Sequence, residues 1–163
     1  MDKKNKQNIY YRVIRKFQGK EFIFKPTYHY ESTELGVKSE DFNEEKSIYK
    51  EVCFSKKLET CFFSIAFFLE PGEYYIYTTN KKPCVDLEKC QYGDFSVFEE
   101  VRYRKNVEAK CIGKIFIDDF TIEQIKDAYI AICNHKDPNI QKAVAKDWLD
   151  SYKAMINHIE SID

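Results

Sequence analysis

The sequence predicts one α+β domain with a helical C-terminal end. Runs rich in aromatic and β-branched residues, which favour strands, recur between residues 9 and 117. From residue 121 onward, apolar residues recur instead at the spacing of an amphipathic helix. The chain has 163 residues, of which 44% are hydrophobic, which is enough for one good core. We therefore expect the strands and helices to share a single core.

Two strands are predicted near the N-terminus. Residues 9–14 (IYYRVI) and 21–25 (EFIFK) are rich in β-branched and aromatic side chains, and a turn at Gly19 separates them. Residues 26–50 are polar and acidic, contain Gly36 and show no sustained periodicity. They are predicted to form a long surface loop, and loops of this length are often functional.

The middle of the chain predicts a strand that leads into a buried helix. Residues 51–55 (EVCFS) form the strand, and Pro71 with Gly72 ends the helix. The helix is predicted from apolar residues at helical spacing, which are Leu58, Cys61, Phe62, Ile65, Phe68 and Leu69.

Three more strands are predicted at residues 73–79, near 95–103 and at 108–117. A second loop, which contains Pro83, Cys84 and Cys90, separates the first two. Gly113 interrupts the last strand, where it marks a bulge or a close approach of another backbone segment.

Two helices follow, and we expect them to form an antiparallel hairpin. Thr121 and Gln124 have the spacing of a capping box, and Asp137 precedes Pro138 as an N-cap precedes a proline at the first helical position. The apolar stripes are Ile122, Ile125, Tyr129 and Ile132 in the first helix and Ile140, Val144, Trp148, Tyr152, Ile156 and Ile159 in the second.

Charge and composition exclude several classes of protein. There are 26 basic and 27 acidic residues, so no overall field attracts nucleic acid or an anionic membrane. The longest apolar run, around residues 61–69, is shorter than the roughly 20 residues of a membrane span, and the polar N-terminus has no signal-peptide pattern. We expect a cytoplasmic protein with no membrane partner and no strong nucleic-acid binding.

Familiar catalytic and metal motifs are absent from the sequence. It has no P-loop, GxGxxG, HExxH or GxSxG pattern, its six cysteines form no CxxC pair, and its three histidines are not at metal-ligand spacing. No metal is therefore expected. The candidate residues are polar side chains within predicted strands, since burial would require each of them to have a partner or a role.

Arg12 is the first candidate, because it interrupts an apolar strand with a guanidinium that can fork onto a phosphate or carboxylate. Strand alternation places it on one face with Tyr10 and Ile14. The alternative is that it points to solvent from a half-buried strand.

Ser55 and the adjacent Glu99 and Glu100 are the next candidates. Ser55 ends its strand just before the predicted helix, so its hydroxyl either caps that helix or holds a ligand. Alternation sends Glu99 and Glu100 to opposite faces of their strand, and one of them is expected to face a pocket. The alternative for that carboxylate is a solvated charge on an edge strand.

His29 and Tyr28 lie in the long polar loop, within the stretch PTYHYES that also contains Tyr30. Their rings are suited to stacking on a nucleotide base. An exposed aromatic loop without a ligand is the alternative.

The order of Arg12, Ser55 and Glu100 resembles the Arg, Ser, Glu order of the ADP-ribosyltransferase superfamily. More specifically, EVCFSKKLETC, EYYIYTT and the stretch from Glu100 through CIGKIFI resemble small proteins of phages and low-GC Gram-positive bacteria. The resemblance covers roughly residues 8–117 and implies an ADP-ribosyltransferase-like domain there, a small split β-sandwich. Residues 118–163 would be a helical hairpin packed on the same domain.

The resemblance also implies an activity. Arg12 would hold a phosphate or ribose of NAD, with Tyr28 and His29 as further contacts. Ser55 would support the nicotinamide ribose, and Glu100 would stabilise the oxocarbenium-like state as nicotinamide leaves. The chain would then be an NAD-dependent mono-ADP-ribosyltransferase acting on an unknown acceptor.

A second hypothesis is a non-catalytic phage-type inhibitor that binds a host defence protein or sequesters a nucleotide. The small size, the acidic stretch from Glu31 to Glu45 and the amphipathic helices favour it. A member of the fold that senses a nucleotide without turning it over is a third reading.

Overall fold

The computed structural model describes residues 7–27, 50–86, 99–155 and 159–162. In these residues, seven strands form one antiparallel sheet in the order β2-β7-β4-β1-β3-β6-β5. The strands are β1 (Tyr10–Ile14), β2 (Glu21–Phe24), β3 (Val52–Ser55), β4 (Gly72–Thr79), β5 (Val85–Asp86), β6 (Glu100–Tyr103) and β7 (Val107–Ile117). The predicted α+β class is confirmed, and the short strand β5 within the second predicted loop was missed.

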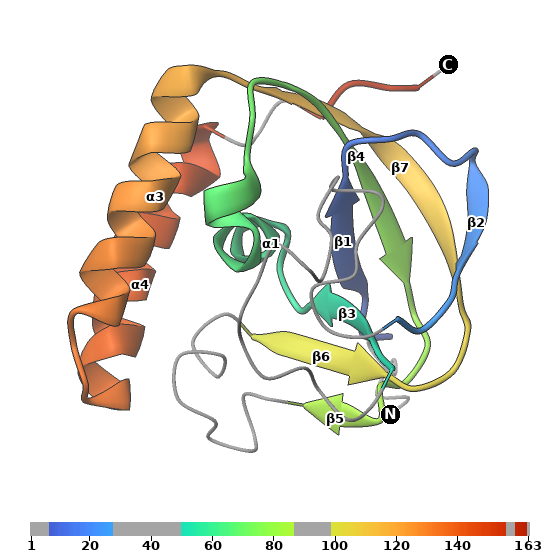
Figure 1. The fold of residues 1–163 in the computed structure, drawn as a ribbon, viewed down its shortest axis with the longest axis horizontal. Coiled ribbons are helices and arrows are strands. Elements are labelled where there is room, and N and C mark those ends of the chain that lie inside the picture. The colour runs from blue at the N-terminus through green and yellow to red at the C-terminus, as the bar shows by residue number, and fades with distance from the viewer. Residues whose placement is uncertain (1–6, 28–49, 87–98, 156–158, 163) are drawn as a thin grey trace, which may run out of the picture.

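The sheet has two parts that meet at a narrow seam between β1 and β3. β1 pairs with β4 along its whole length, but Tyr11 and Ser55 are its one register pair with β3. Figure 1 shows β3, β6 and β5 crossing the direction of β1, β4 and β7. A separate bridge between Thr27 and Glu51 links the end of β2 to the start of β3. The sheet is therefore curled, so that its β2 edge returns toward β3.

The inside of the curl is an aromatic core. Phe24 of β2 packs edge-on against Phe54 of β3 and Tyr77 of β4, with ring centroids 5.7 and 5.4 Å apart. Tyr103 of β6 packs against Phe54 in the same way. Strand alternation sends these residues to one face, and burying them accounts for the aromatic composition of the strands.

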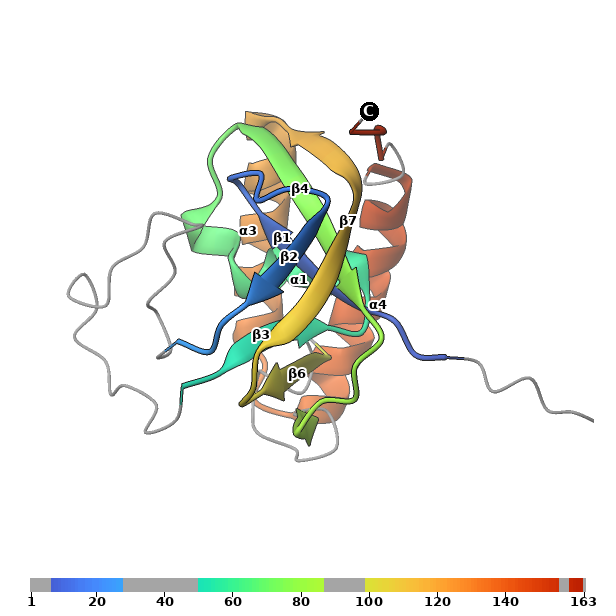
Figure 2. The same cartoon turned by 90° about the vertical axis from the view of Figure 1, so that its right-hand side faces the viewer.

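The other face of the sheet is covered by the helices (Figure 2). α1 spans Leu58–Ser64, α3 spans Asp119–Cys133 and α4 spans Pro138–Met155. Their buried residues form one core with sheet residues such as Val13, Ile76 and Ile115. None of the helices described here has the length and apolar character needed to cross a membrane.

Two predicted helix features are wrong. α1 ends at Ser64, and residues Ala66–Phe68 form a separate 3₁₀ turn, η2, in which the Phe68 N–H donates to the Ile65 carbonyl. The apolar spacing continues through both segments, so it did not reveal the break. The cap of α3 is Asp118, whose carboxylate accepts from the Thr121 N–H at 2.8 Å, so Thr121 is inside the helix.

The cap of α4 matches the prediction, because Asp137 accepts from the Asn139 N–H at 2.9 Å and Pro138 is the first helical residue. Ile159, however, was wrongly assigned to this helix. It lies beyond the end of α4, where the C-terminal segment runs beside β7.

Gly113 has both of the predicted roles. The register between β4 and β7 shifts opposite it, between Ile76 and Tyr77. Lys114 and Glu160 exchange two backbone hydrogen bonds, of 2.9 and 2.8 Å. A Cβ on Gly113 would lie 2.4 Å from Ile159 Cγ2, so the C-terminal segment needs a glycine at this position.

Candidate functional site

The pairing of β3 with β6 brings two predicted site residues together. Ser55 lies directly opposite Glu100, and Cys53 lies opposite Arg102. Opposed residues of an antiparallel pair project from the same face, so these four side chains form one cross-strand group. Ser55 and Glu100 are both buried, at 2% and 6% exposure. This group is the candidate site.

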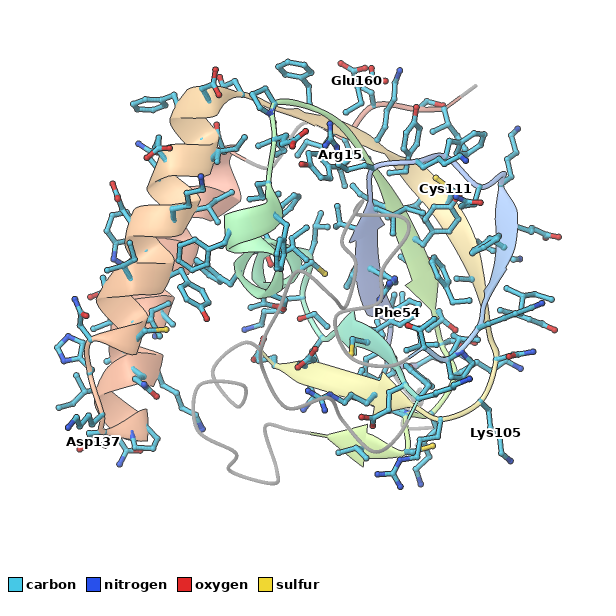
Figure 3. The ribbon with its side chains drawn as sticks, viewed as in Figure 1. Arg15, Phe54, Lys105, Cys111, Asp137 and Glu160 are labelled. Carbon is cyan, nitrogen blue, oxygen red and sulfur yellow. The ribbon has the colours of Figure 1, made fainter. Side chains whose placement is uncertain are left out.

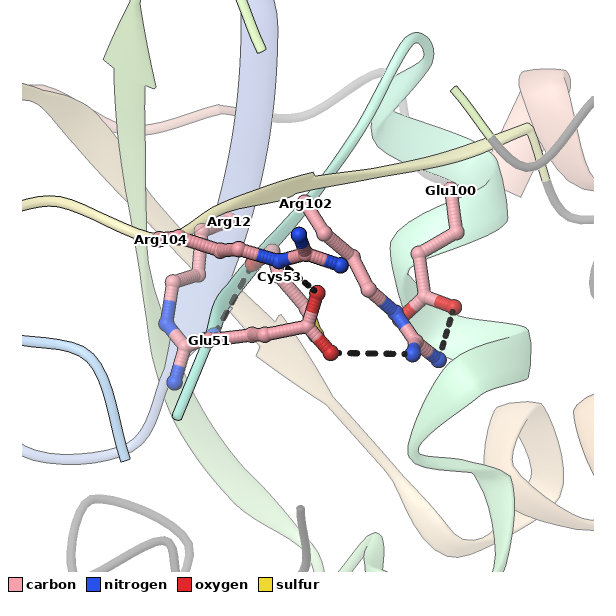
Figure 4. Close-up of polar contacts among 6 residues, drawn as sticks. All are labelled: Arg12, Glu51, Cys53, Glu100, Arg102 and Arg104. Atoms are coloured by element: carbon pink, nitrogen blue, oxygen red, sulfur yellow. Dashed lines mark hydrogen bonds and ion pairs between the residues drawn. The ribbon is translucent and has the colours of Figure 1, made fainter. Parts of the chain in front are cut away.

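Arg102 connects two carboxylates at the centre of the site (Figure 4). Its Nη1 donates to Glu51 Oε1 at 3.3 Å and its Nη2 to Glu100 Oε2 at 3.5 Å. Arg104 approaches the second oxygen of Glu51, with Nε and Oε2 3.7 Å apart. Burial lowers the pKa of a guanidinium, but the Glu100 and Glu51 carboxylates act in the opposite direction, and the pKa of Arg102 is raised. Arg102 is therefore charged at any physiological pH.

Cys53 completes the buried group without being a nucleophile. Burial is the main cause that raises the pKa of its thiol far above the ordinary range, and the Glu100 charge raises it further. The nearby Arg102 and Arg12 charges act in the opposite direction and are weaker. The thiol therefore stays protonated, and a protonated thiol is a poor nucleophile.

The Ser55 hydroxyl bonds to the hydroxyl of Thr60, which also donates to the Lys57 carbonyl at 2.9 Å. The N-cap of α1 is Lys57, and it makes no side-chain capping bond. The helix-capping alternative for Ser55 is therefore wrong. Ser55 instead joins the end of β3 to the first turn of the helix.

Arg12 lies near this group but reaches it from the other side of the sheet. Its guanidinium stacks over the Phe24 ring at 5.1 Å, on the aromatic face that Tyr10 and Ile14 share. Its Nη1 crosses to the Cys53 carbonyl at 2.9 Å. The solvent-facing alternative is therefore wrong. Among the residues that the structure describes, its buried Nε has no hydrogen-bond partner.

Glu99 is separated from Glu100 by the start of β6. It has a φ of 53°, in the left-handed region, and its carbonyl accepts from the Lys56 N–H at 3.0 Å. Its carboxylate pairs with Lys57 at 3.3 Å. The two carboxylates have different partners, and alternation within one strand does not apply to them, because Glu99 lies in the turn before β6.

Tyr28 and His29 lie outside the described residues, as does Cys90. Within the described ranges, no group of three or more His, Cys, Asp or Glu side chains is arranged to hold a metal ion.

Sequence reasoning missed Glu51 and Arg102. A sequence pattern that could have revealed Arg102 is EVRYR, residues 100–104, in which alternation sends Glu100, Arg102 and Arg104 to one face. Glu51 stands at the same parity as Cys53 and Ser55 in EVCFS. Only the register of β3 with β6 shows that these two runs face each other.

A cavity of about 980 Å³ lies elsewhere, along β2, β4 and β7. Its lining residues are Gln7, Ile9, Glu21, Phe22, Ile23, Thr78, Thr79, Asn80, Lys81, Glu108, Ala109 and Lys110. Arg12, Ser55 and Glu100 are not among them. Figure 3 shows how the described side chains are distributed around the fold.

No protein-family model, curated protein or solved structure matches the chain.

Proposed function

We propose that this chain is an NAD-dependent mono-ADP-ribosyltransferase, of phage or bacterial origin, with Glu100 as its key carboxylate. One observation carries the proposal. Ser55 and Glu100 lie directly opposite each other on β3 and β6, although 45 positions separate them in the sequence. Arg12 on the neighbouring β1 reaches the Cys53 carbonyl from the opposite face of the sheet. Residues that are far apart in sequence and close in the fold are what a shared site requires.

The proposed fold is a split β-sandwich of the ADP-ribosyltransferase type with a C-terminal helical hairpin. The narrow seam between β1 and β3 supports it, because the sheet divides there into two parts. Arg12 and Ser55 stand on the two sides of this seam. The side-by-side packing of α3 and α4 supports the hairpin (Figure 1).

In the proposed reaction, the bond between the nicotinamide nitrogen and the ribose C1′ breaks, and its electron pair leaves with nicotinamide. An acceptor nucleophile then bonds to C1′ and loses its proton to solvent. Glu100 would stabilise the positive charge that develops on the ribose, since a carboxylate held in a buried site interacts strongly with a nearby cation. Arg12 would bind a phosphate or ribose, and its Nε, which has no hydrogen-bond partner among the described residues, is a donor suited to that role.

The test combines binding with turnover. Thermal midpoints of the purified wild type, E100Q and E73Q are measured with and without NAD, and nicotinamide release is measured in parallel. Glu73 is a matched control, because its carboxylate is exposed on β4, where it pairs with Lys114. We expect NAD to raise all three midpoints, and wild type and E73Q to release nicotinamide while E100Q does not.

A second candidate is a protein that holds a nucleotide, or a host defence protein, without turnover. It is favoured by the internal bonds of the site, since Arg102 engages Glu100 and Thr60 engages Ser55. A midpoint shift with NAD but no nicotinamide release would support the nucleotide-holding role. No shift in any of the three proteins would contradict both NAD hypotheses and favour a protein partner.

A further inference from the structure

Glu51 and Glu100 are linked through one guanidinium. Arg102 donates an N–H from Nη1 to Glu51 and one from Nη2 to Glu100. Its side chain is 15% exposed, and those of Glu51 and Glu100 are 6% and 8% exposed. Figure 4 shows Arg102 lying between the two carboxylates. A guanidinium is planar, so a contact at each of its two terminal nitrogens fixes both its position and its plane.

Glu51 is itself held firmly. Its backbone exchanges two hydrogen bonds with Thr27, of 3.2 and 2.7 Å, where the end of β2 meets the start of β3. Its two carboxylate oxygens face different arginines, Arg102 and Arg104. It is therefore a rigid support against which Arg102 can be oriented.

The positive charge of Arg102 reduces the negative potential of Glu100, and the negative charge of Glu51 partly restores it. A guanidinium beside Glu100 weakens the attraction of that carboxylate for a developing cation, because the two charges on the pair nearly cancel at a distance. Glu51 shares the same guanidinium and offsets part of its charge. Glu100 therefore keeps more of its negative potential than it would in a simple pair with Arg102.

We infer that Glu51 is a positioning residue for the proposed reaction, which orients Glu100 and preserves its charge by acting through Arg102. The inference rests on the proposed function. It assigns no contact with the substrate to Glu51.

The experiment measures kcat and KM for nicotinamide release in the wild type, E51Q, R102Q and the double variant, with E73Q as control. E51Q is expected to lose roughly tenfold to a hundredfold in kcat, since small misplacement of a reacting group has effects of this size. KM for NAD is expected to stay unchanged. E51Q is expected to have little further effect in the R102Q background, because the two residues act in series.

Folding is checked by far-ultraviolet circular dichroism and the urea midpoint. If E51Q does not fold, kcat and KM are measured for E51D and R102K instead. E51D retains the charge and is expected to recover part of kcat. R102K lacks the planar fork that fixes the orientation of two carboxylates, and it is expected to resemble E51Q.

The outcomes separate the two proposals. Release by the wild type with an equal kcat in E51Q would overturn the role of Glu51 and leave the proposed function standing. Additive losses in the double variant would also overturn it, because Glu51 would then act independently of Arg102. No release by the wild type would overturn the proposed function and this inference together.

Discussion

At the scale of single residues, the most informative group is Arg102 with the two buried carboxylates that it contacts, Glu51 and Glu100. Buried ion pairs are weak evidence of stability, because removing two charges from water offsets most of their attraction. Removing one partner is costly in any case, since a buried charge then remains without compensation. The stability of the fold therefore does not explain the presence of this group, and a role in positioning or binding accounts for it better.

Asp118 gives a prediction with a defined pH dependence. Its pKa is lowered chiefly because its carboxylate accepts hydrogen bonds from Thr121, at the start of α3. A lowered pKa means that Asp118 stabilises the folded state above the pKa of an unfolded aspartate, near 3.9, and that this is lost as the pH falls through the folded-state pKa. D118A is expected to lower the urea midpoint at pH 7.

The difference between wild type and D118A is expected to shrink as the pH falls below about 4. D119A is a suitable control, because Asp119 is also in the first turn but is not the capping residue. A midpoint difference that stays constant from pH 7 to pH 3 would show that the capping carboxylate does not contribute through its charge.

The candidate site was only partly predictable at this scale. Local sequence identified Arg12, Ser55 and Glu100, since polar residues inside apolar strands are conspicuous. It did not identify Thr60 as the partner of Ser55 or Glu51 as the partner of Arg102. The first depends on how α1 leaves β3, and the second on a pairing between segments that are 45 or more residues apart.

At the scale of elements, strand existence was predicted well and helix ends less well. Alternating aromatic and β-branched residues mark β1, β2, β4 and β7 clearly, because each buries at least one face. The break between α1 and η2 and the cap of α3 were missed. Both depend on backbone geometry at one or two residues, which apolar spacing does not encode.

The contact of the C-terminal segment with β7 gives an element-scale prediction. An alanine Cβ at position 113 would lie 2.4 Å from Ile159 Cγ2 and 2.6 Å from the Glu160 carbonyl oxygen, which is too close for either atom. G113A is therefore expected to displace residues 159–160 and to cost about 2 kcal/mol of unfolding free energy, as overpacking typically does.

The measurement is a double-mutant cycle with a chain truncated after residue 158. In the truncated chain, G113A is expected to cost much less, because the clashing atoms are gone. Hydrogen exchange at the Lys114 amide provides a second readout, since this N–H donates to Glu160. An equal cost of G113A in both chains would mean that the C-terminal segment is not what requires the glycine.

At the scale of the whole molecule, the strand and helix patterns correctly indicated an α+β fold, but not the curling of its sheet. The single core expected from length and composition is wrong, because the sheet buries a separate cluster of residues on each face. The curl brings β2 and β3 together although three strands separate them in the sheet order. It places an aromatic core on one face and a helix-covered core on the other. No local pattern specifies this, since it results from the packing of Phe24, Phe54 and Tyr77 across distant strands.

The two cores predict sensitivity to alkaline pH. Burial raises the pKa values of Tyr74, Tyr77 and Tyr103, and each of these phenols donates to a backbone carbonyl. Burial also raises the pKa values of the Cys53 and Cys61 thiols. All five groups stabilise the fold in their neutral form.

Because these pKa values are raised on folding, the stability of the fold falls as the pH rises. Each raised pKa contributes stability that is complete below the unfolded-state value, 9.0 for the thiols and 10.0 for the phenols, and that is lost as the pH rises toward the folded-state value. The urea midpoint is therefore expected to be level to about pH 8 and to fall steeply by about pH 11. A level midpoint across this range, with tyrosinate absorbance appearing in the folded protein, would contradict the burial of these groups.

One edge of β7 is only partly paired with other strands, and this affects the solubility of the protein. β7 is eleven residues long, and β2 pairs with only its first part, through Val107 to Lys110. Farther along, the bridge from Glu160 occupies the same border at Lys114. Backbone groups left open along such a strand recruit strands from other molecules and promote aggregation. β2 and the segment around Glu160 thus cover separate parts of this edge of β7. Removing the segment around Glu160 would favour self-association through β7 before it altered the fold.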